Sequence, residues 1–287
     1  MFEYAAACSL HNGSPVALRD RKDNRAVDVL KRYPELFGNI CIVDDVPAGI
    51  NVWKEKRVPF DKIIVDGSDI LLDGVFFSEK YFDELLVRKM YRPSSSVRSE
   101  LFGKYGDWLS RPNVTSIHVR RGDYIKCMYD FPFAGRNYYR SALRRLPECR
   151  DFIICSDDIL WCKRFFPKTF PDKHFCFAEG NTPLQDIYLQ SFCKNNIMSN
   201  GSFAWWGAYL NEHKEKRVFA PSMWFGFAVP PRVSPIDIYF KGTEVVENHY
   251  DFNDWLYAHW RAYFLRFRKW VNPVTRAVRK CMRRGER

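Results

Sequence analysis

The stretch that decides the fold is residues 186–211, DIYLQSFCKNNIMSNGSFAWWGAYLN. It predicts a helix, a short buried strand ending at Ile197-Met198, a tight polar turn and a second helix. Thr182 is expected to cap the first helix, with Gln185 completing a capping box. Ser202 is expected to cap the second helix, whose two adjacent tryptophans should lie in the core. The stretch therefore predicts one unit of an α/β fold.

The polar turn is a candidate anion site because small residues in it join a strand to a helix. Ser199, Asn200, Ser202 and the N–H group of Phe203 lie where free backbone N–H groups and the positive end of the helix dipole meet. An ordinary capped turn inside an α/β layer has the same sequence features. The turn alone leaves both interpretations open.

Outward from this stretch, short apolar segments alternate with helical patterns. A helix is expected at 137–145 and a shorter one ending at Phe165. Strands are expected at 116–119, 152–156, 174–178 and 218–221. This alternation predicts a parallel, doubly wound sheet.

Polar residues follow three of these strands. Arg120-Arg121-Gly122-Asp123 follows the first, Asp157-Asp158 the second, and the turn at 199–202 the strand before it. Open α/β sheets bind ligands outside the carboxyl ends of their strands. Arginines and a helix N-terminus at that edge suit a pyrophosphate, and an acid there suits a base or a sugar hydroxyl.

The first hundred residues are less regular. Helices are expected at 2–10, 26–33, 79–88 and 94–103, strands at 16–18, 38–46, 63–65 and 75–77, and a linker at 106–113. We therefore divide the chain into an N-terminal α/β domain (1–108), a C-terminal α/β domain (109–240) and a final segment (241–287).

Composition excludes several classes. The 287 residues contain no apolar run long enough to span a membrane and no secretory leader, and the nine cysteines form no Cys-x-x-Cys pair. The sequence also lacks a P-loop, a Gly-x-Gly-x-x-Gly turn and an Asp-x-Asp pair. We expect a cytoplasmic protein with free thiols and no bound metal or cofactor.

The net charge of +11 is concentrated at the C-terminus. Residues 255–287 contain ten Lys or Arg and a single acid, Glu286. Residues 254–271 predict an amphipathic helix rich in aromatic residues, and a basic tail follows. Such a helix suits the interface of an anionic membrane, peripherally on its cytoplasmic face. It would equally suit packing against the N-terminal domain, and amphipathicity does not separate the two.

Four blocks of the sequence carry a family resemblance. His118-Val119-Arg120-Arg121-Gly122-Asp123 resembles the His-x-Arg-Arg-x-Asp motif of fucosyltransferases, and residues 186–211 are similar to the second signature block of α-1,2-fucosyltransferases, glycosyltransferase family 11. Residues 155–166 and 218–225 resemble two further blocks in the same order. The resemblance covers roughly residues 1–240.

The resemblance implies a GT-B architecture, in which two Rossmann-like domains face each other across a cleft. The N-terminal domain would take the acceptor and the C-terminal domain GDP-fucose. It implies an inverting, metal-independent transfer of L-fucose to the 2-hydroxyl of a β-galactoside in a glycan, for example a lipid-linked precursor of a surface polysaccharide or O-antigen.

The resemblance also implies roles for individual residues. Arg120 would hold the pyrophosphate, His118 would lie near the nucleoside and Asp186 would accept hydrogen bonds from guanine. The phosphate turn would be Ser199, Asn200, Ser202 and Phe203, and further donor-side candidates are Arg121, Asp157 and Asp158.

Asp123 is the carboxylate of the motif nearest to the chemistry. It could take the proton of the acceptor hydroxyl, or it could orient Arg120 by an ion pair. A carboxylate beside an arginine is a weaker base, and the sequence leaves the two roles open.

The sequence departs from the family pattern in two places. Met1-Phe2-Glu3-Tyr4-Ala5 stands after the point where relatives have a first strand and a Gly-rich turn, so that strand is expected to be missing. Gly201 stands where a serine is usual. Alternatives are a fucosyltransferase of another linkage, or a catalytically impaired protein that binds a membrane or nucleic acid through its basic tail; no nucleic-acid motif supports the latter. The acceptor and the oligomeric state are not specified by the sequence.

Overall fold

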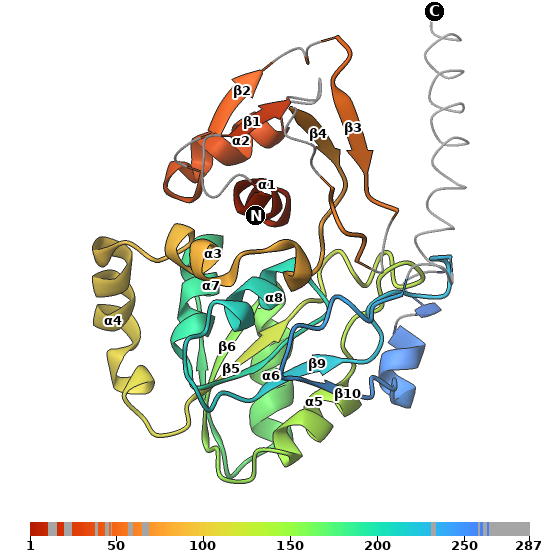
Figure 1. Ribbon diagram of the computed structural model, residues 1–287. Helices are drawn as coiled ribbons and strands as arrows, with labels where there is room; N and C mark the ends of the chain where they lie inside the picture. Colours follow the sequence, from red (N-terminus) through yellow and green to blue (C-terminus); the bar gives the residue numbers. More distant parts are fainter. Residues whose placement is uncertain are drawn as a thin grey trace, which may run out of the picture. The chain divides into compact units, whose positions relative to one another are not determined.

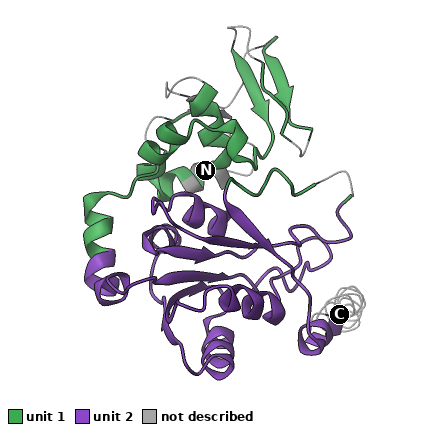
Figure 2. Ribbon diagram, turned by 60° about the horizontal axis from the view of Figure 1, so that its bottom comes forward, with its two compact units in different colours: residues 1–100, 230–241 green, residues 101–229, 242–287 purple. Residues whose placement is uncertain are grey.

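The computed structural model describes residues 1–10, 16–19, 25–37, 40–43, 46, 48–56, 60–64, 69–230, 234–257, 259–260 and 263. The chain forms two compact units (Figure 2). Unit 1 consists of residues 1–100 and 230–241, and unit 2 of residues 101–229 and 242–287. Residues 230–241 thus belong with the first hundred residues, although the sequence-based division put 230–240 in the C-terminal domain. That division into functional domains stays a prediction.

Unit 2 contains a six-stranded parallel sheet with the order β10-β9-β8-β5-β6-β7. Figure 1 labels β5, β6, β9 and β10 of this sheet. The strands of the sheet are β5 (Thr115–Val119), β6 (Asp151–Ser156), β7 (His174–Phe177), β8 (Asn195–Ile197), β9 (Val218–Pro221) and β10 (Thr243–Val246). This confirms the predicted parallel α/β sheet. Strand β10 was not expected from the sequence.

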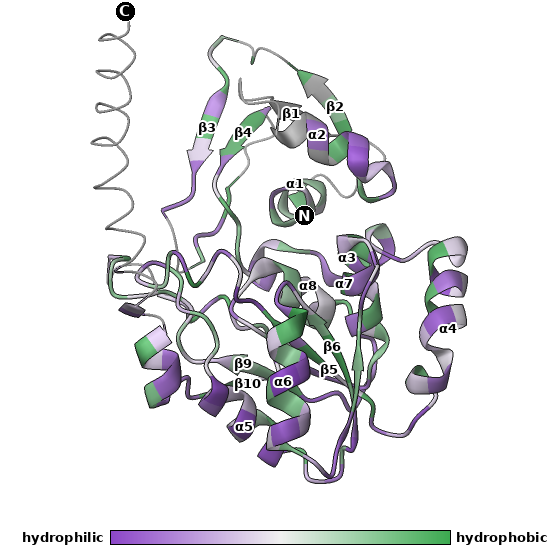
Figure 3. Ribbon diagram, turned by 180° about the vertical axis from the view of Figure 1, so that it is seen from behind, coloured by the Kyte–Doolittle hydropathy of each residue, from purple (hydrophilic) through white to green (hydrophobic). Residues whose placement is uncertain are grey.

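Helices cover both faces of this sheet, as Figures 1 and 2 show. They are α5 (Arg136–Arg144), α6 (Ile159–Thr169), α7 (Pro183–Phe192) and α8 (Ser202–Tyr209). In Figure 3, α6 is hydrophobic along one side and hydrophilic along another, as expected of a helix that packs on a sheet. Its buried residues Cys162 and Phe166 join a core that contains Ile117, Phe152 and Tyr139.

The order of the strands creates a switch point beside β5. From β5 the chain steps to β6 and then to β7, and α7 then carries it back to β8 on the other side of β5. At such a reversal the loops after neighbouring strands diverge and leave a crevice at their carboxyl ends, where ligands of open α/β sheets bind. In this sheet the switch point lies between β5 and β8, which pair with each other.

The two helices of the deciding stretch form largely as expected. Thr182 accepts the N–H of Gln185 at 3.2 Å and the side chain of Gln185 accepts the N–H of Thr182 at 2.8 Å, so the predicted capping box is confirmed. The expectation that Ser202 caps α8 is wrong by one residue. Gly201 is the N-cap, with extended backbone (φ −157°), and Ser202 is the first helical residue. Glycine serves as an N-cap at a cost of only a few tenths of a kcal/mol relative to serine.

Unit 1 contains two small parallel sheets among its described residues. Its helices and strands are α1 (Phe2–Leu10), β1 (Val16–Arg19), α2 (Arg25–Arg32), β2 (Ile40–Val43), β3 (Asn51–Lys54), β4 (Ile70–Asp73) and α3 (Glu84–Met90). Helix α4 (Ser95–Leu109) begins in unit 1 and passes into unit 2 after Glu100. β1 pairs with β2, and β3 pairs with β4. The GT-B arrangement of two facing Rossmann-like domains stays a prediction.

Two predicted strands of unit 1 are wrong. Residues 75–77 turn instead, because Phe76 has a positive φ of 52° and Glu55 accepts the N–H groups of Val75 and Phe76 at 2.7 and 3.0 Å. Residues 63–64 are irregular, and residue 65 lies outside the described residues. Helix α4 runs to Leu109, so it includes half of the predicted linker at 106–113.

The chain after β10 continues into a helix at residues 252–257. Positions 259, 260 and 263 are also helical, and the rest of the predicted helix at 254–271, with the basic tail, lies outside the described residues. No helix within the described ranges has the length and apolarity needed to cross a membrane.

Candidate functional site

Arg120 begins the turn that follows β5, and two carboxylates hold its guanidinium. Nη2 donates to Asp123 Oδ2 at 2.8 Å, and Nη1 lies 3.0 Å from Asp157 Oδ2. The arginine side chain remains 38% exposed. A charged group is therefore held at the carboxyl edge of the sheet and is still reachable from solvent.

Asp157, after the neighbouring strand β6, fixes the backbone of this turn. Its carboxylate accepts the N–H of Arg121 at 2.8 Å and the N–H of Gly122 at 3.2 Å. A Cβ on Gly122 would lie 2.9 Å from Asp157 Oδ2, so the carboxylate fits the turn only because residue 122 is glycine. Asp157 therefore orders the turn as well as pairing with Arg120.

Arg121 points away from this edge and is only 3% exposed. Its Nε donates to Asp158 Oδ2 at 3.2 Å, and Asp158 also caps α6 by accepting the N–H of Trp161 at 3.2 Å. Both residues thus have structural partners inside unit 2. The donor-binding role that we assigned to them and to Asp157 stays a prediction.

His118 joins the two strands at the switch point. Its Nδ1 lies 2.7 Å from the Oγ of Ser199, which follows β8, and its ring packs on Phe203 with centroids 5.0 Å apart. Burial, and secondarily the charge of Arg120, lowers the pKa of His118 to about 3. The imidazole is therefore neutral at physiological pH, and it fixes the position of the turn at 199–202.

The turn itself is held from two other segments. The buried Asn200 donates its side-chain N–H groups to the carbonyls of Pro132 and Trp224. Gly201 supplies no side-chain acceptor as N-cap of α8, so the first N–H groups of that helix remain directed at the edge of the sheet. Ser202 is exposed there, and Ser199 is fully buried. An anion at this position would meet backbone N–H groups and the positive end of the helix dipole.

Tyr124 connects the two parts of the site, and the sequence analysis missed it. The Cζ of Arg120 lies 5.6 Å from the centre of its ring, and a Cβ on Gly201 would lie 3.4 Å from its Oη. Burial raises the pKa of Tyr124 to about 12, so its hydroxyl keeps its proton and can donate. Its position directly after Asp123 was the available signal. The structure thus brings Arg120 and the turn at 199–202 together, as the sequence predicted.

Asp186 occupies the same edge at the start of α7, which follows the outer strand β7. Its Oδ1 accepts the side-chain N–H of Asn181 at 2.7 Å, and Asn181 Oδ1 in turn accepts from Lys104 Nζ at 2.7 Å and from Tyr105 Oη at 3.1 Å. Burial raises the pKa of Asp186. The residues that orient this carboxylate were not expected from the sequence.

In the part of the chain that the structure describes, no group of three or more His, Cys, Asp or Glu side chains is arranged to hold a metal ion. What the site offers instead is one accessible arginine, backbone N–H groups of a helix and a neutral tyrosine. These groups suit a ligand with phosphate oxygens.

Comparison with known proteins shows a match to one protein family over part of the chain. Residues 85–224 match the family described as Glycosyl transferase family 11. The O-antigen biosynthesis glycosyltransferase WbnK of Escherichia coli is 36% identical over 123 residues, which are 39% of this chain and 39% of WbnK. An alpha-1,2-colitosyltransferase of Escherichia coli is 34% identical over 162 residues, covering 53% of this chain and 55% of that protein.

A human relative, galactoside alpha-(1,2)-fucosyltransferase 1, is 33% identical over 127 residues, or 41% of this chain and 34% of that protein. The chain therefore matches between about a third and about half of the length of these relatives. A solved structure, NodZ alpha-1,6-fucosyltransferase soaked with GDP-fucose, has a TM-score of 0.37 at 16% identity, covering 67% of this chain and 60% of that one. A similarity this low does not assign the fold.

Proposed function

Because residues 85–224 match the family described as Glycosyl transferase family 11, we propose that the chain transfers L-fucose from GDP-fucose to the 2-hydroxyl of a β-galactoside, with inversion and without a metal ion. The observation that carries the proposal is the position of Arg120 beside the turn at 199–202 and the start of α8. This is the edge of the sheet where a nucleotide binds in open α/β folds. The proposed acceptor is a glycan ending in β-galactose, such as a lipid-linked O-antigen precursor.

In the proposed mechanism, Arg120 and the first N–H groups of α8 stabilise the negative charge that develops on the departing GDP. The neutral hydroxyl of Tyr124 is a further donor at this position. These groups are fixed before the ligand arrives, so they do not have to reorganise as charge builds up. In the proposed donor complex Asp186 accepts hydrogen bonds from guanine, and its Oδ1 is already occupied by Asn181.

For Asp123 we propose the orienting role. Its carboxylate pairs with Arg120 at 2.8 Å, so it is placed to hold the guanidinium at the edge of the sheet. His118 is buried against Ser199 and neutral, so in this proposal it shapes the turn and does not exchange protons with the acceptor.

The test of donor binding is a calorimetric titration of the chain with GDP, followed by initial rates with GDP-fucose and a galactoside. Arg120→Ala should lower the rate by about 10²–10³, the loss typical of removing one such donor. Arg150→Ala is the matched control, because Arg150 is an exposed arginine at the other end of β6. Absence of GDP binding, or equal rates for Arg120→Ala and the native chain, would refute the proposal.

A second donor sugar is favoured by one relative, the alpha-1,2-colitosyltransferase. The same nucleotide site could serve a colitosyl donor, because the groups described above address the diphosphate and the base. Parallel assays with fucosyl and colitosyl donors, with linkage analysis of each product, decide between the two sugars. A product joined at a position other than the 2-hydroxyl would overturn the linkage.

We also propose that the C-terminal segment contacts an anionic membrane on its cytoplasmic face. Five apolar side chains at helical spacing are 47–73% exposed: Phe252, Trp255, Leu256, Trp260 and Tyr263. In the sequence, ten basic residues between 255 and 287 accompany this apolar stripe. Aromatic residues and basic charge together favour the interface of an anionic bilayer.

Vesicle flotation tests this contact. The chain should float with vesicles containing phosphatidylserine and remain unbound with phosphatidylcholine alone. Replacing Trp255 and Trp260 by Ser should abolish flotation. Equal behaviour on both lipids, or no effect of the double substitution, would refute it.

A further inference from the structure

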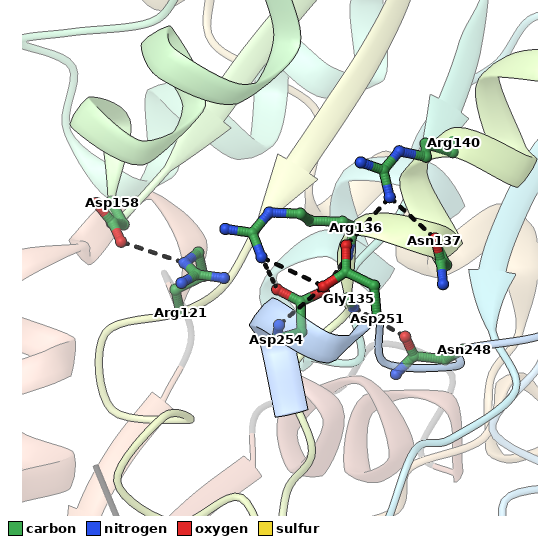
Figure 4. A network of polar contacts seen from close by, with 9 residues as sticks. All are labelled: Arg121, Gly135, Arg136, Asn137, Arg140, Asp158, Asn248, Asp251 and Asp254. Carbon is green, nitrogen blue, oxygen red and sulfur yellow. Dashed lines mark hydrogen bonds and ion pairs between the residues drawn. The ribbon is translucent and has the colours of Figure 1, made fainter. Parts of the chain in front are cut away.

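Residues 248–257 contact the start of α5 and the buried Arg121, and they lie beyond the family match that ends at residue 224. We call Asn248, Asp251, Asp254 and Tyr257 the clasp. Figure 4 shows three of them, with the residues that they bind. The clasp contacts segments more than a hundred residues earlier in the chain, so it fixes long-range structure in unit 2.

The clasp caps α5 in place of a local cap. Gly135, the N-cap residue of α5, has no side chain to accept from the helix. Asp254 Oδ2 accepts the N–H of Arg136 at 2.6 Å, and Asn248 Oδ1 accepts the N–H of Gly135 at 2.8 Å. A Cβ on Gly135 would lie 2.9 Å from the ring of Tyr250 and 3.0 Å from Asp254 Oδ2, so the glycine makes room for the clasp.

Ion pairs reinforce these bonds. Arg136 Nη1 lies 2.9 Å from Asp254 Oδ1, and Arg140 Nη1 lies 3.1 Å from Asp251 Oδ2 (Figure 4). Asp254 is 1% exposed. Burial raises its pKa, while the charges of Arg136 and Arg121 act in the opposite direction. Asp254 is thus a buried partner of Arg136 at the start of α5.

Aromatic rings surround the guanidinium of Arg121. Its Cζ lies 4.2 Å from the ring centre of Trp161, 5.1 Å from that of Phe133 and 5.5 Å from that of Tyr257. Nε donates to Asp158, and Nη1 has no hydrogen-bond partner in the described structure. The guanidinium of Arg121 is therefore held mainly by aromatic rings and by the carboxylate of Asp158. Tyr257 supplies one of the three aromatic contacts described here.

We propose that the clasp positions the turn at 120–123 through Arg121. Arg121 is the covalent neighbour of Arg120, and its own N–H is fixed by Asp157. The contact of Tyr257 with the guanidinium of Arg121 and the bond of Asp157 to its backbone N–H would together restrict the backbone that carries Arg120. Asp254 and Tyr257 are positioning residues in this proposal, and their effect on GDP rests on the proposed function.

The test compares substitutions of two aromatic residues in the same helix, Tyr257 and Trp255. Tyr257→Leu removes a contact to Arg121 from a side chain that is 39% exposed, so the chain should still fold. Trp255→Leu is the matched control, because Trp255 stacks on His259 and has no contact with Arg121. Asp254→Asn is a second variant, which keeps an acceptor for the N–H of Arg136 and removes the charge.

Two readouts separate positioning from general stability. Hydrogen–deuterium exchange of the free protein measures the exchange rates of the backbone N–H groups of Arg121 and Gly122. Both groups donate hydrogen bonds to Asp157. Calorimetry gives the Kd for GDP, with melting temperatures measured in parallel. Tyr257→Leu and Asp254→Asn should speed exchange at 121–122, and Tyr257→Leu should weaken GDP binding by about 3- to 10-fold, the range expected for losing a partly buried cation–π contact. Trp255→Leu should change neither.

The outcomes distinguish this inference from the proposed function. Unchanged exchange at 121–122 in Tyr257→Leu and Asp254→Asn refutes the clasp, whatever GDP does. Faster exchange in Trp255→Leu as well refutes it too, because the effect would then be general. Faster exchange with no GDP binding by any form, the native chain included, supports the coupling and refutes the proposed function.

Discussion

Acid should destabilise unit 2 because His118 is buried in its neutral form against Ser199. Its pKa in the folded protein is about 3, below the ordinary value of 6.5. Between these two values the unfolded chain binds a proton that the folded chain does not. Stability is therefore fully present above pH 6.5 and falls as the pH decreases toward 3.

The size of the effect follows from the two pKa values. Each unit of pH between them is worth up to about 1.4 kcal/mol, so lowering the pH from 7 to 5 should cost about 2 kcal/mol from His118 alone. Carboxylates contribute their own pH dependence, so the comparison must be with a variant that lacks the imidazole. His118→Asn keeps a polar group near the hydroxyl of Ser199 and does not titrate in this range.

Urea unfolding of the native chain and of His118→Asn, followed by tryptophan emission at pH 7 and pH 5, measures the difference. The native chain should lose about 2 kcal/mol more than the variant over this interval. His249→Asn is the control, because it makes the same replacement at a histidine whose side chain is 72% exposed. Equal losses in the native chain and in His118→Asn would show that His118 is accessible to protons in the folded state and would refute the reasoning.

Further predictions concern single side chains. Gly207→Ala should destabilise the chain by about 1–3 kcal/mol in urea unfolding, since its Cβ would lie 2.9 Å from a side chain of α7. Gly201→Ala should change stability by less than about 0.5–1 kcal/mol, since its nearest new contact is 3.4 Å. Asp158→Ala should lower the free energy of unfolding by at least about 1 kcal/mol, because α6 loses its cap and Arg121 its carboxylate. If the proposed function holds, Asp186→Asn should weaken GDP binding more than ADP binding in calorimetry, because the carboxylate is proposed to read guanine; equal losses would contradict that role.

Local sequence patterns predicted the elements of unit 2 well where a cap or an apolar strand marked them. The capping box from Thr182 to Gln185 and the strand at 218–221 form at the predicted residues. The alternation of strands and helices also predicted which polar groups share an edge of the sheet, because parallel strands present their carboxyl ends together. That rule explains why Arg120 and the turn at 199–202 lie close together.

Other features had no local signal. Asp254 caps a helix that begins 118 residues earlier, and no spacing rule connects the two positions. The preference for a hydroxyl at the N-cap favoured Ser202, but the backbone is still extended at Gly201 and becomes helical at Ser202. Gly201 is therefore the N-cap. Phe76 broke a predicted strand because a distant carboxylate, Glu55, stabilises its positive φ.

In the structure Arg120 lies between two aspartates, and this arrangement affects which anions can bind it. Together with Arg121 and Asp158, these side chains place two positive and three negative charges around one turn. A small free anion such as sulfate has little to offer an arginine that is already neutralised, and it would have to compete with tethered partners. A guanidinium has five N–H donors, so a ligand that gains hold elsewhere along the sheet, through further oxygens or a ring, can bind Arg120 while both carboxylates stay in place. Under the proposed function we therefore expect simple salts such as sulfate to compete only weakly for Arg120.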